Sequence, residues 1–205
     1  MAKDIDDNDL EISVEEIVAG RERDREIALS SAGMAASRDL TASSYCPELL
    51  SLNFLVVDPS RFYRAVIKNA LAAFRIVKVA EAPDGGAALQ ALKAGQIDFV
   101  LTDYNMPVLN GIEFVRMVRW SDEAGLNPEV PIIMITAATE HKLVIEARNA
   151  GVHEFVCKPL VPRDLFDRIR KTVLRPRPFI SVETYRGPDR RWIDREAPAS
   201  AGKAA

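Results

Sequence analysis

Four side chains in the sequence could together carry out phosphoryl transfer. Each stands at the end of an apolar run: Asp58, Asp103, Thr136 and Lys158. An acid that binds a divalent ion, a second acid that attacks phosphorus, a hydroxyl donor and an ammonium suit that chemistry, because metal and ammonium offset charge on the equatorial oxygens. Taken alone, Asp103 could also be a metal ligand or a helix N-cap, and the N-cap is the commoner role for an aspartate. The predicted strands and helices around Asp103 must decide between these roles.

The elements that would position these residues follow a βα repeat. Helix-like stretches with their own apolar period alternate with apolar strand-like runs at 54–57, 76–80, 97–101, 132–135 and 154–157. This alternation predicts an α/β fold, a doubly wound five-stranded parallel sheet with helices on both faces. In such sheets the functional groups gather at the carboxyl ends of the strands, so the four side chains are expected to converge on one edge.

The charge layout predicts a compact body between two arms. Residues 1–50 hold 5 basic and 12 acidic side chains, a balance of −7, and 51–174 are nearly neutral. Residues 175–205 are rich in proline and arginine. We expect an acidic N-terminal arm with one short helix at about 14–29 and a linker at 30–44, a domain at 51–174, and a basic C-terminal tail.

Composition narrows the class of protein. The two cysteines, Cys46 and Cys157, lie far apart in sequence, which gives no support to a disulfide framework or a metal cluster. The amino terminus lacks a basic segment followed by an apolar one, and no run approaches the roughly 20 apolar residues of a membrane helix. These features predict a cytoplasmic protein without a membrane span.

The motifs resemble one family specifically. Phe54 to Asp58, Asp103 to Gly111, Ile135 to Ala137 and Lys158-Pro159, in this order, are similar to the receiver domain of bacterial two-component response regulators, which has a flavodoxin-like fold. The resemblance covers roughly residues 51–174. It implies that Asp103 is the phosphoacceptor and that the Lys158-Pro159 bond is cis. It further implies a Mg²⁺ site made by Asp58, Asp103 and the carbonyl of Asn105, and a switch made by Thr136, Lys158 and Phe155.

One position departs from the family pattern. Receivers usually carry two adjacent acids after the first strand, and the second is usually a direct Mg²⁺ ligand, whereas here the pair is Asp58-Pro59. Mg²⁺ readily keeps water in place of a protein ligand, so we expect weakened rather than abolished binding. The alternative is a phosphorylation-independent pseudo-receiver that acts as a scaffold or a nucleotide-responsive adaptor.

The resemblance also implies how the protein signals. A sensor histidine kinase or a phosphotransfer protein would supply the phosphoryl group, and repacking of Phe155 would reshape the face formed by the fourth helix, fifth strand and fifth helix. The output protein is not identified by the sequence. No DNA-binding domain fits in the last thirty residues, so we expect a stand-alone receiver that acts through protein contacts rather than as an enzyme.

The C-terminal tail mixes arginines with aromatic residues. The group consists of Tyr185, Arg186, Arg190, Arg191 and Trp192. Such side chains could stack on guanine, contact its edge and neutralise phosphates, and they are similar to the arginine-rich tails of chemotaxis-type receivers that bind cyclic di-GMP. Arg186 and Arg190 also have the Arg-x-x-x-Arg spacing of PilZ proteins, whose second motif is absent. A solvated tail, a strip docked on the receiver, and general RNA or anion binding are the alternatives.

Overall fold

A five-stranded parallel sheet forms the centre of the protein in the computed structural model, which describes residues 46–137 and 141–191. The strand order is β2-β1-β3-β4-β5. β1, β3 and β4 are buried at every position. This burial explains why their residues are apolar or uncharged, apart from Asp103 at the end of β3. The strands are β1 (Phe54–Val57), β2 (Val79–Ala82), β3 (Phe99–Asp103), β4 (Ile132–Thr136) and β5 (Glu154–Cys157).

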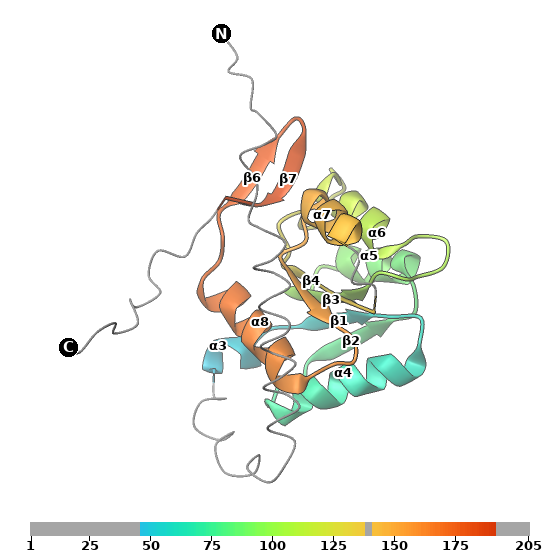
Figure 1. Ribbon diagram of the computed structural model, residues 1–205, viewed down its shortest axis with the longest axis vertical. Coiled ribbons are helices and arrows are strands. Elements are labelled where there is room, and N and C mark those ends of the chain that lie inside the picture. The colour runs from blue at the N-terminus through green and yellow to red at the C-terminus, as the bar shows by residue number, and fades with distance from the viewer. Residues whose placement is uncertain (1–45, 138–140, 192–205) are drawn as a thin grey trace, which may run out of the picture. The chain divides into compact units, whose positions relative to one another are not determined.

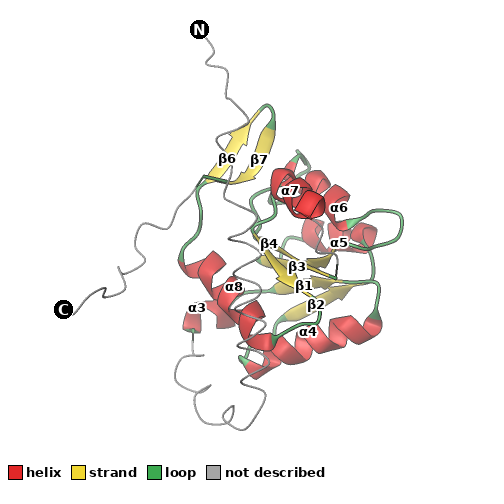
Figure 2. Ribbon diagram, viewed as in Figure 1, coloured by secondary structure: helices red, strands yellow, loops and turns green. Residues whose placement is uncertain are grey.

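Helices cover both faces of this sheet (Figure 1). They are α3 (Pro47–Leu50), α4 (Arg61–Ala73), α5 (Gly85–Lys93), α6 (Gly111–Arg119), α7 (His141–Ala150) and α8 (Pro162–Leu174). One core cluster joins the sheet to α5, α6 and α7, and a second joins its other face to α3, α4 and α8. Figure 2 shows the yellow strands between these two groups of red helices.

Three helices begin at polar residues that follow the strand ends. Ser60 and Asp84 accept hydrogen bonds from the backbone at the starts of α4 and α5. Asn110 forms a capping box with Glu113 at the start of α6. These side chains satisfy amide groups that a helix leaves unpaired in its first turn. They therefore fix where the chain turns from the carboxyl edge of the sheet into a helix.

The predicted fold class is confirmed, although three of the five strands differ from their predicted bounds. Arg75 adopts a left-handed conformation (φ 64°) after α4, and Ile76 is buried in the core before β2 begins at Val79. The predicted strand at 76–80 therefore started too early. β3 runs two residues beyond its predicted end because Asp103 itself pairs with Ile135 of β4.

The N-terminal helix predicted at 14–29 and the linker at 30–44 lie outside the described residues. The described chain begins with Cys46, and Cys46 and Leu49 are buried in the core cluster that includes α8. Among the described residues, no helix has both the length and the apolar character needed to cross a membrane.

After α8 the chain forms a hairpin instead of a solvated tail. Strands β6 (Phe179–Val182) and β7 (Tyr185–Pro188) pair antiparallel, with Val182 opposite Tyr185. Tyr185 is buried and donates its hydroxyl hydrogen to the Pro188 carbonyl at 2.7 Å. The backbone of Gly187 packs against Gly151 in the turn between α7 and β5. The tail predicted from the sequence is thus, up to residue 191, a strip docked on the receiver.

A buried arginine connects the hairpin to the sheet. Arg119, at the end of α6, is fully buried and donates to the carbonyls of Gly151, Pro128 and Val130 at 2.6 to 3.1 Å. Its guanidinium lies 5.6 Å from the centre of the Phe179 ring. Burial lowers the pKa of Arg119 to about 9. The cation is satisfied by backbone oxygens, so the hairpin covers a hydrogen-bonded charge rather than a purely apolar surface.

We predict that Gly187→Ala destabilises the protein. A Cβ at this position would lie 2.5 Å from the Tyr185 hydroxyl and 2.7 Å from the Gly151 Cα, so the hairpin would have to shift away from the α7–β5 turn. Overpacking of this kind costs about 1–3 kcal/mol, which urea denaturation of the full chain would measure.

Gly86→Ala is the matched control. Its Cβ would meet only the Asp84 carboxylate, at 3.3 Å, and the position lies in the first turn of α5. Alanine should leave stability unchanged or raise it by up to about 1 kcal/mol. Equal midpoints for Gly187→Ala and the wild type would contradict the packing of β7 on Gly151.

We also predict that His153 makes stability depend on pH. Burial, together with the neighbouring Arg119 and Arg177 guanidinium groups, lowers the pKa of His153 well below 6.5. Its Nδ1 accepts from the Ile132 amide at 3.2 Å, which requires a neutral ring. Because the unfolded chain binds the proton more tightly, this stabilisation is complete above about pH 6.5 and is lost below it, by at most about 1.4 kcal/mol per pH unit.

The measurement is the free energy of unfolding of the wild type and His153→Gln between pH 5 and 8. The variant should show a shallower loss of stability on acidification, because its side chain takes up no proton. Identical pH slopes for the two proteins would contradict a buried neutral histidine.

Candidate functional site

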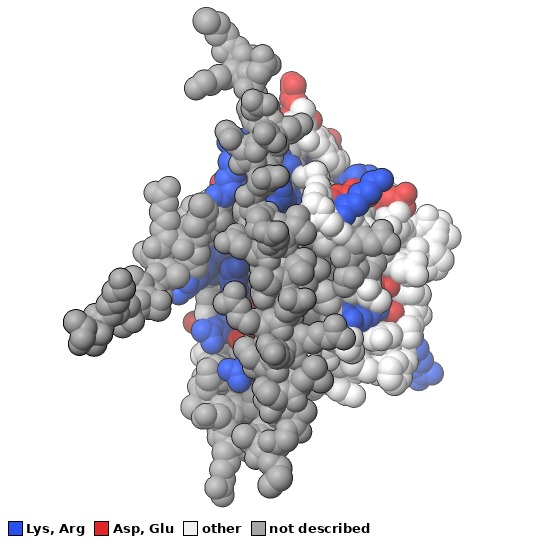
Figure 3. All heavy atoms as spheres, viewed as in Figure 1, with Lys and Arg blue, Asp and Glu red and all other residues white. Residues whose placement is uncertain are grey.

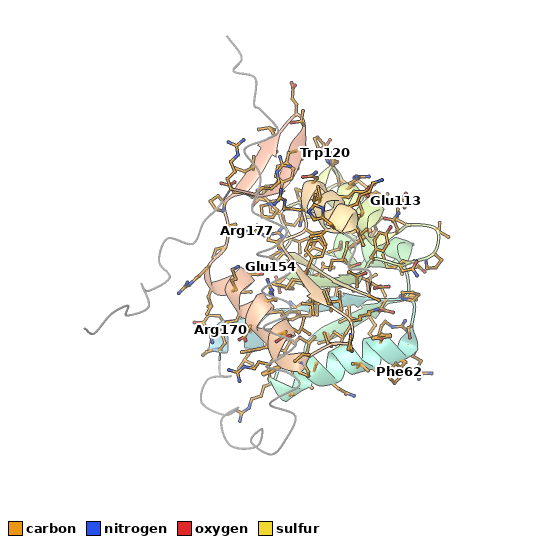
Figure 4. The ribbon with its side chains drawn as sticks, in the orientation of Figure 1. Phe62, Glu113, Trp120, Glu154, Arg170 and Arg177 are labelled. Carbon is orange, nitrogen blue, oxygen red and sulfur yellow. The ribbon has the colours of Figure 1, made fainter. Side chains whose placement is uncertain are left out.

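The four side chains singled out in the sequence meet at the carboxyl edge of the sheet. Asp58 follows β1, Asp103 ends β3, Thr136 ends β4 and Lys158 follows β5. The parallel register places Thr136 opposite Cys157, directly before Lys158. In Figure 4, Phe62 and Glu113 mark the beginnings of α4 and α6 on this side, whereas Trp120 and Arg177 lie toward the hairpin.

Lys158 bridges the two aspartates. Its Nζ lies 2.8 Å from Oδ2 of Asp58 and 3.0 Å from Oδ1 of Asp103. All three side chains are less than a tenth exposed, at 9%, 2% and 8% respectively. Burial opposes the charge on Lys158, but the hydrogen bonds that its ammonium donates to the two carboxylates outweigh this effect, and the pKa of Lys158 is raised. The site therefore holds a charged lysine between two acids.

Backbone amides fix the remaining carboxylate oxygens. The Ser60 amide donates to Oδ1 of Asp58 at 2.7 Å, and the Asn105 amide donates to Oδ2 of Asp103 at 3.2 Å. Each aspartate thus has one oxygen facing the lysine and one bound by the loop that follows it. This arrangement sets the rotamers of both acids, as a reaction that needs an aligned nucleophile requires.

The segment after Asp103 is tightly constrained. A Cβ at Gly111 would clash with the Asp103 carbonyl, so the start of α6 packs directly on the end of β3. Val108 is fully exposed and has φ 67°, a conformation that is unusual for a β-branched residue. The Lys158-Pro159 bond is cis, which confirms the prediction from the family resemblance.

Thr136 and Phe155, the predicted switch residues, lie on the neighbouring strands β4 and β5. Thr136 is buried at the end of β4, and its carbonyl accepts from the Lys158 amide at 2.9 Å. Phe155, on β5 opposite Met134, is partly buried against the core cluster shared by α5, α6 and α7. Thr136 is therefore joined to Lys158 through the backbone, and Phe155 lies three residues before Lys158 on the same strand and its following loop.

The donor set is compatible with Mg²⁺. Asp58, Asp103 and the backbone carbonyl of Asn105, an exposed residue, would offer oxygen ligands, and Mg²⁺ prefers oxygen and keeps several waters. Pro59 is exposed and contributes no carboxylate. The described residues contain no group of three or more histidine, cysteine, aspartate and glutamate side chains that could hold a metal. A metal ion here would be held by few protein ligands.

Two residues of α4 belong to the site although the sequence reasoning did not select them. The Tyr63 ring lies against Lys158, with 4.0 Å between the ring centroid and Nζ. Arg64 donates to the Asp58 carbonyl at 2.7 Å and pairs with Glu81 of β2 at 2.9 Å. Both lie one turn into the helix after Asp58, a location that could have singled them out.

The residues predicted to bind a nucleotide make contacts within the protein. The Arg186 guanidinium lies 4.8 Å from the Trp120 ring centre and 3.5 Å from Asp122. That of Arg190 lies 4.3 Å from the Tyr185 ring centre and donates to Asn149 at 2.6 Å. Arg191 is exposed, and Trp192 lies outside the described residues. Basic side chains are visible beside the hairpin in Figure 3.

Comparisons with known proteins agree with this geometry. Residues 54–170 match the family model of the response regulator receiver domain. The chain is 38% identical over 120 residues to the chemotaxis protein CheY of Pseudomonas aeruginosa, a match that covers 58% of this chain and 94% of the relative. It is 36% identical to CheY-3 of Vibrio cholerae over 59% of this chain and 91% of that protein.

Solved structures show the same fold. The chemotaxis response regulator CheY4 of Vibrio cholerae aligns with a TM-score of 0.53 and 29% identity, over 58% of this chain and 97% of that one. The receiver domain of the sensor histidine kinase PA1611 from Pseudomonas aeruginosa aligns with a TM-score of 0.51 and 27% identity, over 58% and 94%. That structure contains a magnesium ion coordinated in its active-site cleft.

Proposed function

We propose that this chain, which belongs to the response regulator receiver domain family, accepts a phosphoryl group on Asp103 and signals through protein contacts. The observation that carries the proposal is the buried ammonium of Lys158 between Asp58 and Asp103. A carboxylate held by a cation and a backbone amide is aligned to attack phosphorus and is provided with charge to stabilise the product.

The chemistry follows from these contacts. A carboxylate oxygen of Asp103 attacks the phosphorus of a phosphohistidine on a kinase or phosphotransfer protein. A P–O bond forms and the P–N bond breaks with its electron pair going to the ring nitrogen, so an imidazole whose other nitrogen already carries a proton leaves as the neutral ring. Lys158 exchanges its contact with Asp103 for the new phosphoryl oxygens, and the Thr136 hydroxyl donates to another.

Mg²⁺ would supply further positive charge against the transferring group. We propose that Asp58, Asp103 and the Asn105 carbonyl hold it, and that Pro59 weakens this binding relative to receivers with a second acid. The support is the composition of the site: two carboxylates are present, and Lys158 already contacts both. The ion would compete with Lys158 for the same oxygens.

Phosphorylation would change the shape of one face. The phosphoryl group adds nearly two negative charges close to Thr136 and Lys158. Movement of the Thr136 loop would let Phe155 repack between β5 and α7. We propose that the face formed by α7, β5 and α8 contacts the output protein, because Phe155 belongs to β5 and packs against the core cluster that includes α7.

A phosphorylation-independent pseudo-receiver is the alternative. The observation in its favour is Pro59. Lys158 neutralises part of the negative charge of Asp58 and Asp103, and no second acid after β1 adds to the affinity of the site for Mg²⁺. Such a protein would bind its partner equally well with or without a phosphodonor.

The distinguishing prediction is phosphorylation of the wild type by acetyl phosphate with Mg²⁺. Phosphate-affinity electrophoresis should show a shifted band that Asp103→Asn loses completely, since an amide is no nucleophile for phosphorus. Asp98→Asn is the control, because this exposed carboxylate only binds Asn53 at the opposite edge of the sheet. An unshifted wild type, or an equal shift in Asp103→Asn, would favour the pseudo-receiver.

Cyclic di-GMP is a further proposed ligand of the C-terminal region. In its favour, arginines lie beside aromatic rings in this region: the Arg186 guanidinium is 4.8 Å from the Trp120 ring centre, and that of Arg190 is 4.3 Å from the Tyr185 ring centre. The nucleotide would have to displace Arg186 and Arg190 from the ring faces of Trp120 and Tyr185 against which they lie.

Calorimetric titration of cyclic di-GMP into the full chain tests this proposal. We expect the wild type to give binding heat. Changing both Arg190 and Arg191 to alanine should weaken the affinity at least about tenfold, which corresponds to about 1.4 kcal/mol. RNA of mixed sequence should bind weakly or not at all. An absence of heat with the wild type would remove cyclic di-GMP as a ligand.

A further inference from the structure

Tyr63 lies against the lysine that joins the two aspartates. The Lys158 Nζ is 4.0 Å from the centre of the Tyr63 ring, within the range of a cation–π interaction. The Lys158 side chain is only 9% exposed, so solvent weakens this attraction little. The ring therefore makes a third contact with the ammonium, besides Asp58 and Asp103.

The position of the ring is fixed by the start of α4. The Tyr63 amide donates to the hydroxyl of the N-cap Ser60 at 3.3 Å, and the Ser60 amide binds Asp58. The ring also meets Phe62 edge to face, with centroids 5.8 Å apart. The same short segment thus orients both Asp58 and the aromatic face that contacts Lys158.

An ammonium on a four-carbon stem needs such a contact to keep one position. Lysine has three donors and a flexible chain, and here two carboxylates account for two directions. An aromatic face attracts the cation without adding a formal negative charge. It restrains Lys158 from leaving the aspartates, while leaving the charge of the site unchanged for an incoming phosphoryl group.

The replacement at position 59 makes this restraint consequential. With proline in place of an acid, Lys158 is the protein's main positive charge at the phosphoacceptor and any Mg²⁺ is held by few protein ligands. The stabilisation of charge on the transferring phosphoryl group then depends more strongly on where the Lys158 ammonium lies.

We propose that Tyr63 is a positioning residue for phosphoryl transfer: its ring holds the Lys158 ammonium in the bridge between Asp58 and Asp103. The proposal rests on the function proposed above for its effect on rate. The placement itself is a separate property of the unphosphorylated protein.

The first test measures placement by NMR, without a phosphodonor. The ε-methylene protons of Lys158, assigned by their loss in Lys158→Met, should be shifted upfield by the ring current in the wild type and in Tyr63→Phe. They should return to ordinary values in Tyr63→Leu. Tyr63→Phe is the matched control, because it keeps the ring that lies against Lys158 and removes only the hydroxyl. Unshifted protons in the wild type would overturn the proposal.

The second test measures the rate of phosphorylation by acetyl phosphate at saturating Mg²⁺. Tyr63→Leu should lower the rate constant by roughly tenfold, the upper part of what a partly desolvated cation–π contact supplies, whereas Tyr63→Phe should stay within about twofold. Equal rates for Tyr63→Leu and Tyr63→Phe would overturn a role for the ring.

The two tests separate this proposal from the proposed function. If the wild type takes up no phosphoryl group, the function fails, and the NMR shifts alone decide whether Tyr63 places Lys158. A shift present in the wild type and Tyr63→Phe but lost in Tyr63→Leu supports the placement. A shift that survives in Tyr63→Leu contradicts it.

Discussion

The buried contact of Lys158 with Asp58 and Asp103 is the interaction on which the site depends. Two carboxylates at this distance from one cation would repel each other if the lysine were absent, and their burial would add to the cost. Removing one partner of such a buried arrangement typically costs about 3–5 kcal/mol. The three side chains come from segments 45 to 100 positions apart in the chain. The parallel register of β1, β3, β4 and β5 is what brings them to one point.

The proline at position 59 changes the charge of this site rather than its shape. Asp58, Asp103 and Lys158 carry a formal charge of −1 together, and a second acid would make it −2. The turn after β1 is nevertheless held, because Ser60 both caps α4 and binds Asp58, and Arg64 donates to the Asp58 carbonyl. The backbone of the site is thus independent of the residue that the family normally uses for metal binding.

The sequence predicted the sheet and the convergence of its polar residues, because both depend on local patterns. Apolar runs of strand length, turn residues and polar side chains at the strand ends are all visible in a single chain. The ring of Tyr63 over Lys158 was not predictable in this way, since it joins a helix residue to a loop 95 positions later. Residue type alone does not indicate which aromatic side chain of a helix faces inward.

The contacts of the C-terminal segment could not be predicted from the sequence for a related reason. Its arginines look solvent-exposed in the sequence because nothing local pairs with them. In the structure, partners come from distant positions: Arg177 donates to the His153 carbonyl, and Arg190 to Asn149. Nothing in the sequence around Arg119 indicates that this residue is fully buried. Carbonyl oxygens serve as its acceptors, and these leave no trace in composition.

The contact between the hairpin and the α7–β5 turn also defines where this protein can be cut. The family match ends at residue 170, yet the packed chain continues through β7, whose Gly187 touches Gly151 and whose partner strand places Phe179 over Arg119. A fragment trimmed to the family boundary would expose the Arg119 cation and the carbonyls around it to water. The packed chain is therefore longer than the segment that matches the family model, and junctions for fusions belong beyond residue 191.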